Sequence, residues 1–158
     1  MRTRVHAIVL PSEVLGDFAD EVREIFGELG REYGLDTLAG ECTPPIDVYE
    51  TDAALEISVD LPGVDPAAVR ILVKGTQVLI AGDKAPRRGR GDSSFHLVER
   101  DFGRFARSVR LTTPCDASRA HAALDKGELR ITLPKVRERR GRTIHIPLQP
   151  LADRQSDI

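Results

Sequence analysis

Residues 120–135 read AHAALDKGELRITLPK, and the fold prediction starts from this stretch. Leu129, Ile131 and Leu133 alternate with polar residues, which is the period-two pattern of a half-buried β-strand. Ala120–Leu124 is a further short strand, and Lys126-Gly127 between the two has the composition of a tight turn. The stretch therefore predicts two strands joined by a turn.

The same pattern extends upstream over most of the chain. We expect strands at Ile46–Tyr49, Leu55–Leu61, Val69–Val73, Gln77–Ala81, Phe95–Arg100 and Phe105–Leu111, with turns at Pro62-Gly63, Gly75-Thr76 and Gly82-Asp83. About eight short strands with no convincing helix between them predict an all-β fold, an antiparallel, immunoglobulin-like β-sandwich over residues 46–134. The chain has no Trp, so it lacks the Cys…Trp…Cys core of a true immunoglobulin domain.

Residues 1–45 predict an amphipathic N-terminal arm and linker. Ser12 is a candidate N-cap, and apolar residues then recur at helical spacing; they are Val14, Leu15, Phe18, Val22, Ile25, Phe26 and Leu29. Gly27, Gly30 and Gly34 weaken the far end of this helix. The helix either packs on its own domain or offers apolar surface to a partner, and the sequence leaves both open.

Residues 135–158 predict a flexible, extended tail. A charged stretch is followed by Thr143-Ile144-His145-Ile146-Pro147, in which Ile144 and Ile146 point the same way if the segment is extended, about 6.6 Å apart. Pro147 limits further strand pairing. The segment is either a last strand of the same domain or an extended peptide that adds to a sheet edge.

Composition and charge exclude several classes of protein. No apolar run approaches the roughly 18 residues of a membrane span, and Val5–Leu10 is too short for a secretory signal, so we expect a cytoplasmic location. Residues 1–45 carry a net charge of −5, residues 46–134 of 0 and residues 135–158 of +3. The acidic arm and basic tail are a weak indication of self-association.

The sequence offers no catalytic or cofactor-binding motif. The four histidines (His6, His96, His121 and His145) lack metal-ligand spacing, and the two cysteines (Cys42 and Cys115) stand alone. A phosphate loop and a nucleophile elbow are both missing. We therefore predict no enzyme activity, cofactor or metal.

Two basic clusters raise the possibility of nucleic-acid binding. Arg87, Arg88 and Arg90 form one cluster, and Arg137, Arg139, Arg140 and Arg142 form the other. No aromatic residues interleave for base stacking, so we interpret both clusters as solvated stretches and predict no nucleic-acid partner.

Arg107 departs from the strand pattern. It shares the apolar parity of Phe105 and Val109. A charge at this position must be paired with a carboxylate or lie at a subunit boundary, unless it is simply exposed at the strand end.

Several linked motifs closely resemble the small heat-shock proteins, the α-crystallin domain family, in their bacterial and plant form. They are Ala122-x-x-x-Lys126-Gly127-Glu128-Leu129, Asp60-Leu-Pro-Gly-Val64, Val98-Glu-Arg100, Phe102-Gly-Arg-Phe-Ala-Arg-Ser108, Leu129-Arg-Ile-Thr-Leu-Pro-Lys135 and the C-terminal I-x-I motif Ile144-His145-Ile146. The similarity covers about residues 45–147. Lys126 and Glu128 depart from the family's usual Asn and apolar residue, and a left-handed Lys126 costs about 1 kcal/mol.

The resemblance implies an ATP-independent holdase that binds unfolding client proteins in the stress response. It implies a dimer, then a higher homo-oligomer, in which the loop strand Phe95–Arg100 (with Phe95, His96, Leu97 and Val98) exchanges between subunits and Arg107 lies in the dimer region. Ile144 and Ile146 would enter a groove lined by Val69, Ile71, Val73, Ala120, Ala122 and Leu124. Phe18, Val22, Ile25 and Phe26 of the arm are the candidate client-binding residues. The alternative is a β-sandwich interaction or co-chaperone module that docks on one defined partner.

Overall fold

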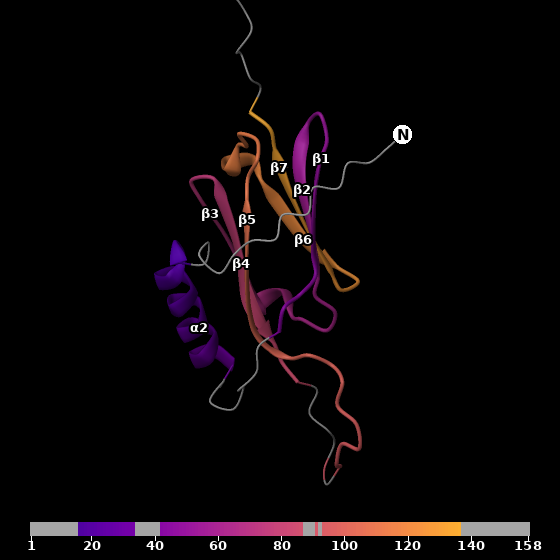
Figure 1. The fold of residues 1–158 in the computed structure, drawn as a ribbon. Coiled ribbons are helices and arrows are strands. Elements are labelled where there is room, and N and C mark those ends of the chain that lie inside the picture. Colours follow the sequence, from indigo (N-terminus) through magenta and orange to yellow (C-terminus); the bar gives the residue numbers. More distant parts are fainter. Residues whose placement is uncertain (1–15, 34–41, 87–90, 92, 137–158) are drawn as a thin grey trace, which may run out of the picture.

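A computed structural model describes residues 16–33, 42–86, 91 and 93–136 of the chain. One helix, α2 (Ala19–Tyr33), precedes seven strands (Figure 1). The strands are β1 (Ile46–Glu50), β2 (Ala54–Asp60), β3 (Val69–Lys74), β4 (Gln77–Lys84), β5 (Gly103–Arg110), β6 (His121–Asp125) and β7 (Glu128–Pro134). Short 3₁₀ helices at Pro66–Ala68 and Ala117–Arg119 begin at Asp65 and Asp116, whose carboxylates accept from backbone N–H groups. None of the helices in these residues is long and apolar enough to cross a membrane.

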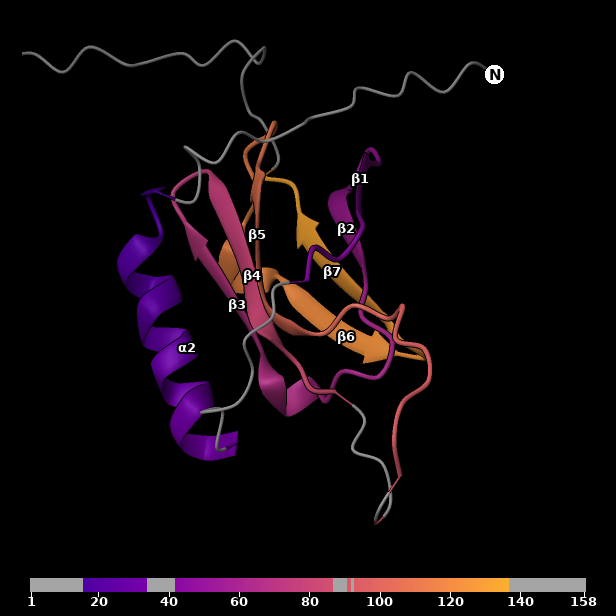
Figure 2. The same cartoon turned by 60° about the horizontal axis from the view of Figure 1, so that its bottom comes forward.

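The strands form two antiparallel sheets that pack face to face. One sheet has the order β1-β2-β7-β6 and the other the order β3-β4-β5 (Figure 2). In the first sheet, Ile57 lies opposite both Val48 and Ile131, so residues of the same parity share one face. In the second, Ile80 lies opposite Ile71 and Arg107. The predicted antiparallel sandwich is confirmed.

The main core lies between the two sheets and is built from the residues that alternate along each strand. Ile57, Val59 and Leu133 are fully buried, as are Val78 and Ile80 from the opposing sheet. Phe105 packs against the backbone at Gly82, where an added Cβ would lie 2.7 Å from the Phe105 ring. Such a Cβ would lie closer still to the backbone carbonyl oxygen of Ala68, so a side chain at position 82 does not fit without moving the backbone as well as the aromatic ring.

Helix α2 covers the outer face of the β3-β4-β5 sheet, away from the main core (Figures 1 and 2). Phe18, Ile25 and Leu29 are buried there against Ala68, Leu79 and Ala81. Of the two placements left open by the sequence, the helix takes the one on its own domain. It continues through Gly27 and Gly30 to Tyr33, because the burial of Leu29 holds its last turns on the sheet. The expected N-cap Ser12 lies outside the described residues.

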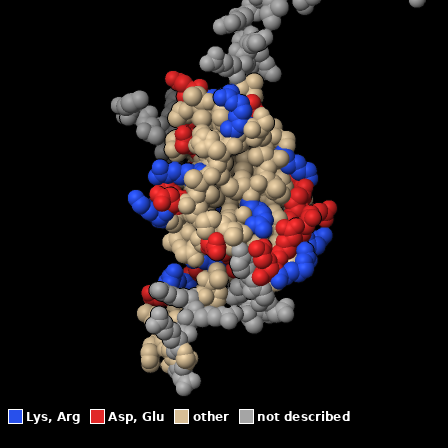
Figure 3. Space-filling model, turned by 180° about the vertical axis from the view of Figure 1, so that it is seen from behind, with Lys and Arg blue, Asp and Glu red and all other residues tan. Residues whose placement is uncertain are grey.

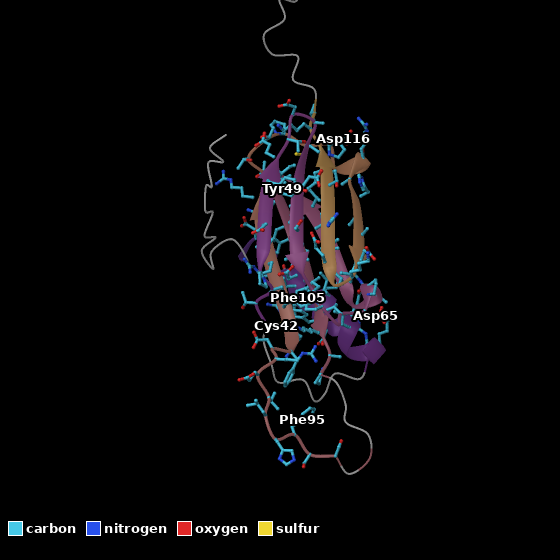
Figure 4. All side chains as sticks on the ribbon, turned by 90° about the vertical axis from the view of Figure 1, so that its right-hand side faces the viewer. Cys42, Tyr49, Asp65, Phe95, Phe105 and Asp116 are labelled. Carbon is cyan, nitrogen blue, oxygen red and sulfur yellow. The ribbon has the colours of Figure 1, made fainter. Side chains whose placement is uncertain are left out.

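The expected strand at Phe95–Arg100 is absent from the described chain. Residues 95–100 form no ladder, and Phe95 (69% exposed), Leu97 (72%) and Val98 (58%) project into solvent. Phe95 lies on a loop that extends below the sandwich, away from both sheets (Figure 4). The alternating pattern predicts a strand, but no strand among the described residues lies beside this segment to supply hydrogen-bond partners.

Candidate functional site

The side chains predicted to line a groove come from two edge strands, β3 of one sheet and β6 of the other. Val69, Ile71 and Val73 are half-buried against the main core from β3, and Ala120 and Leu124 are half-buried from the β6 side.

Ala122 lies between Ala120 and Leu124 in the sequence and is exposed. Seen from behind Figure 1, the surface has a central band that carries few charged side chains, with charged clusters on both flanks (Figure 3). Five of the six predicted groove residues thus pack against the same main core, and the groove itself stays a prediction. The residues predicted to fill the groove, Ile144 and Ile146, lie outside the described residues.

The opposite side of the sandwich has a different edge on each sheet. The edge of β5 is covered by residues 42–45, because the Cys42 N–H donates to the Arg104 carbonyl at 3.1 Å. Strand β1 is the outer strand of its own sheet and pairs only with β2. Its side chains Val48 and Tyr49 are 37% and 49% exposed. Among the described residues, no strand pairs with the outer edge of β1.

Arg107 is half-buried and faces the side of β5 that carries Phe105 and Val109. Its Nη1 donates to the carbonyl oxygen of Pro44 at 2.6 Å, and no ion pair of Arg107 occurs among the described residues. The expectation of a carboxylate partner is therefore not met among the described residues. The backbone carbonyl of Pro44 is the hydrogen-bond acceptor of Arg107 instead of a carboxylate. The position of Arg107 at a subunit boundary stays a prediction.

The four candidate client-binding residues of the arm are covered in this chain. Phe18 and Ile25 are buried against the outer sheet face, and Val22 and Phe26 are half-buried at the same contact. The receiving face was not anticipated from the sequence. Its only signal was the continuous apolar run Val78–Ala81, since a strand without alternation is buried on both faces.

Polar contacts frame this helix–sheet interface at both ends. Near the start of the helix, Lys74 Nζ donates to Glu21 Oε1 at 2.7 Å and to the Asp17 carbonyl at 3.2 Å. At the far end, Arg70 pairs with Glu32 at 3.7 Å. The hydrogen bond from Lys74 lowers the pKa of the Glu21 carboxyl, and the same bond raises the pKa of Lys74.

Two aromatic rings of the helix segment also lie under cations from the sheet. Lys74 Nζ is 5.9 Å from the centroid of the Phe18 ring, and the Arg104 guanidinium is 5.3 Å from the centroid of the Phe26 ring. Both distances are within the range of a cation–π attraction. The basic side chains at the edges of this sheet face thus contact acidic residues of the helix segment (Arg70 and Lys74) or its aromatic rings (Lys74 and Arg104).

A buried carboxylate lies on the same sheet face. Asp83 is 4% exposed, and neither of its oxygens has a hydrogen-bond partner in the part of the chain that the structure describes. Burial raises the pKa of the Asp83 carboxyl, and the charge of Arg104, directly across the ladder, opposes part of that rise.

The described residues bring together no group of three or more His, Cys, Asp or Glu side chains that could hold a metal ion. Cys42 and Cys115 are free thiols, and burial raises the pKa of both. The Cys42 thiol lies 3.6 Å from the Gly103 carbonyl oxygen. Neither thiol is therefore activated as a nucleophile.

The chain is similar to heat-shock proteins over its sandwich region. The model of the Hsp20/alpha crystallin family matches residues 47–149. An 18.9 kDa heat shock protein of Oryza sativa subsp. japonica is 39% identical over 107 residues, which cover 67% of this chain and 60% of the rice protein. The spore protein SP21 of Stigmatella aurantiaca is 34% identical over 92 residues, 58% of this chain and 54% of that protein.

The match therefore spans little more than half the length of these two curated relatives. Among solved structures, Heat shock protein 16.0 from Schizosaccharomyces pombe superposes with a TM-score of 0.59 at 30% identity. That superposition covers 68% of this chain and 99% of the yeast chain.

Proposed function

The chain belongs to the Hsp20/alpha crystallin family, whose members are non-enzymatic chaperones, and from that premise we propose that it is an ATP-independent holdase that binds partly unfolded proteins and prevents their aggregation. The observation that carries the proposal is the set of half-buried apolar side chains on the edge strands β3 and β6 of a sandwich of this family. The absence of a phosphate loop from the sequence supports a mechanism without nucleotide.

We propose that Ile144 and Ile146 of a neighbouring subunit occupy the predicted groove. Two buried isoleucine side chains contribute about 3–6 kcal/mol before the entropy of ordering the tail is subtracted. One such link is weak and opens readily, whereas many links in a closed assembly hold it together. The exposed Ala122 supports the proposal, because a methyl group leaves room for a larger side chain.

We propose that the dimer forms when residues 95–100 of one subunit add to β1 of the other. The apolar side chains of this loop are exposed in the single chain and have no strand beside them. Of the four edge strands, β3 and β6 flank the groove and β5 is covered by residues 42–45, which leaves β1 as the acceptor. Strand addition would pair the free backbone groups of both segments.

Clients are proposed to bind the apolar stripe of the arm when α2 leaves the sheet. Phe18 and Ile25 are covered in the closed chain, so this surface becomes available only after release of the helix. Such an arrangement keeps apolar residues away from solvent until they are needed.

Light scattering of an aggregating client tests the function directly. The full chain, at equimolar or higher subunit concentration and above the client's unfolding temperature, should suppress aggregation equally with and without ATP. No suppression at a severalfold excess of subunits would contradict the proposal. The alternative, a module that docks on one partner, predicts a monomer or small oligomer by native mass measurement, whereas the holdase predicts a large assembly.

A further inference from the structure

We propose that the outer face of the β3-β4-β5 sheet, which α2 covers, is a second docking surface for amphipathic helical segments of unfolding proteins whose apolar stripe is flanked by acidic side chains. This inference rests on the proposed holdase function and names a client class and a site for it. Helix α2 is then a displaceable cover that occupies the site in the closed chain.

The contact beneath α2 leaves several polar groups without partners. Within the part of the chain that the structure describes, the buried side-chain atoms lacking a hydrogen bond are Gln77 Oε1, both carboxylate oxygens of Asp83 and Ser108 Oγ. Gln77 and Asp83 share the parity of Leu79 on β4, and Ser108 lies opposite Leu79 on β5, so all three residues are on the face that α2 covers.

The main core between the two sheets contains no such atom among the described residues. Water would satisfy each of these groups once the helix left, and a buried polar group without a partner disfavours the state that buries it. The unsatisfied polar groups of the described residues are therefore concentrated on the sheet face that α2 covers. This asymmetry is what a displaceable cover requires.

The floor of the surface fits a helix with large apolar side chains. Ala68, Ala81 and Ala106 have small side chains, and Phe18, Ile25 and Leu29 lie over them and over Leu79. Leu72, on the same face of β3, remains 36% exposed beside the docked helix. An incoming apolar segment therefore has an accessible contact at the margin before α2 is displaced.

The rim of the surface selects acidic flanks. Arg70 and Lys74 are four residues apart on β3, about 13 Å, and their partners Glu32 and Glu21 are eleven residues apart on α2, about 16 Å. Arg104 on β5 lies over Phe26 from the other side. A segment with acidic residues at this spacing and an aromatic stripe satisfies all three cations, whereas a basic segment would be repelled by them.

A labelled peptide of residues 16–33 is a suitable probe, with a charge-reversed peptide that carries Lys in place of Asp17, Glu21 and Glu32 as its counterpart. In the full chain, Leu29→Ala weakens the hold of α2 without altering the sheet. It should tighten binding of the acidic peptide about tenfold or more, because the open fraction of the site rises. Glu28→Ala, on the exposed side of the helix, should leave the affinity unchanged.

The rim is tested by adding Lys74→Glu to Leu29→Ala. The acidic peptide should then bind more weakly and the charge-reversed peptide more tightly than they bind to Leu29→Ala alone. Equal affinity of the acidic peptide for wild type, Leu29→Ala and Glu28→Ala would overturn the proposal. Equal affinity of that peptide for Leu29→Ala with and without Lys74→Glu would overturn it as well. If Leu29→Ala does not fold, Glu21→Gln removes only a rim contact and should shift the affinity in the same direction.

Client protection distinguishes this site from the arm itself. Leu29→Ala should protect an acidic-flanked client better than wild type does, and excess acidic peptide should abolish the gain. If the peptide binds as expected but leaves the gain intact, the surface accepts only α2 and the client assignment is wrong. Failure of wild type to protect any client contradicts the holdase proposal instead, while the peptide titration still reports on the site.

Discussion

The guanidinium of Arg107 donates to the carbonyl oxygen of Pro44 at 2.6 Å, and this bond ties the middle of β5 to the segment that enters β1. Pro44 is buried, and the neighbouring Cys42 is hydrogen-bonded to the backbone of the same strand. A charged donor therefore satisfies a buried carbonyl at the junction of the two sheets. The bond explains how an arginine is accommodated at a position with the parity of core residues.

Arg107→Ala should destabilise the fold by about 1.5–3 kcal/mol, because it removes a hydrogen bond made by a charged group and leaves the Pro44 carbonyl unpaired. This is less than the cost of stranding a buried carboxylate, about 3–5 kcal/mol. Thermal unfolding of both proteins at low concentration measures the difference. A melting temperature equal to that of wild type would show that the bond contributes nothing. Arg110→Ala, at an exposed position of the same strand, is the control.

Lys126→Asn should stabilise the fold by about 0.5–1 kcal/mol. Lys126 has φ 49° and Gly127 has φ 82°, so both residues of the β6–β7 turn are left-handed, as the sequence predicted for Lys126. Asn adopts this conformation more readily than Lys does. Chemical denaturation measures the gain, and a loss of stability would mean that the lysine side chain makes a compensating interaction.

The matched variant Gly127→Ala should act in the opposite direction. Its Cβ would lie 3.0 Å from the Pro62 Cα, in addition to the strain of the positive φ. We expect a loss of about 1 kcal/mol or more. A neutral effect would indicate that the turn rearranges.

Asp83→Asn should raise the melting temperature more at pH 7 than at pH 4. Burial raises the pKa of Asp83 above its ordinary value of 3.8, so the folded state binds the proton more tightly than the unfolded chain does. The stability associated with this group is present at low pH and is lost as the pH rises through the raised pKa. The amide variant has no such dependence. Thermal unfolding across pH 4–8 measures it.

Asp116→Asn provides a control with the opposite sign. Hydrogen bonds from Ser118 lower the pKa of the exposed Asp116 carboxyl, so its contribution is present at neutral pH and lost on acidification. Asp116→Asn should therefore reduce stability at pH 7 and have less effect near pH 3. If the two variants showed the same pH dependence, the assignment of the Asp83 effect to its own carboxyl would be wrong.

The sandwich was predictable because alternation along a strand reports directly on which residues face the core. Leu129, Ile131 and Leu133 alternate in sequence and are buried in the structure. The sequence carries no comparable pattern that identifies the hydrogen-bond partner of a polar side chain. Arg107 binds a backbone carbonyl, and any residue can supply a carbonyl. Residues 95–100 have a strand-like pattern, but a strand also needs a neighbour, which this chain does not place beside them.

The position of α2 was not predictable for a related reason. An apolar stripe shows that a helix must be covered, but it does not identify the cover. The run Val78–Ala81 indicated burial on both faces of β4 without saying what lay on the second face. Only the structure brings Leu79 and Ala81 under Phe18, Ile25 and Leu29. The contact between the apolar stripe of the helix and the outer face of the sheet depends on the tertiary arrangement, which the sequence of neither segment specifies on its own.

Ile144→Ala combined with Ile146→Ala should leave folded dimers but dissolve larger assemblies. The proposed groove between β3 and β6 is lined by half-buried apolar side chains and by the exposed Ala122, so loss of both isoleucines removes the side chains proposed to fill it. Strand β6 allows a matched pair of variants, at Ala122 and Ala123. Ala122 has the parity of the groove, whereas Ala123 faces the opposite side of β6 and pairs with Arg130. A charge at Ala122 should therefore mimic the tail variant, and the same charge at Ala123 should not.

Size-exclusion chromatography with light scattering measures the result for the tail variant, Ala122→Glu and Ala123→Glu at equal subunit concentration. We expect dimers for the first two and a wild-type assembly for the third, because only the first two prevent burial of apolar side chains in the groove. A large assembly that survives all three substitutions would exclude the groove as the link. Dissociation by Ala123→Glu as well as Ala122→Glu would instead show that the outer face of β6 takes part in assembly.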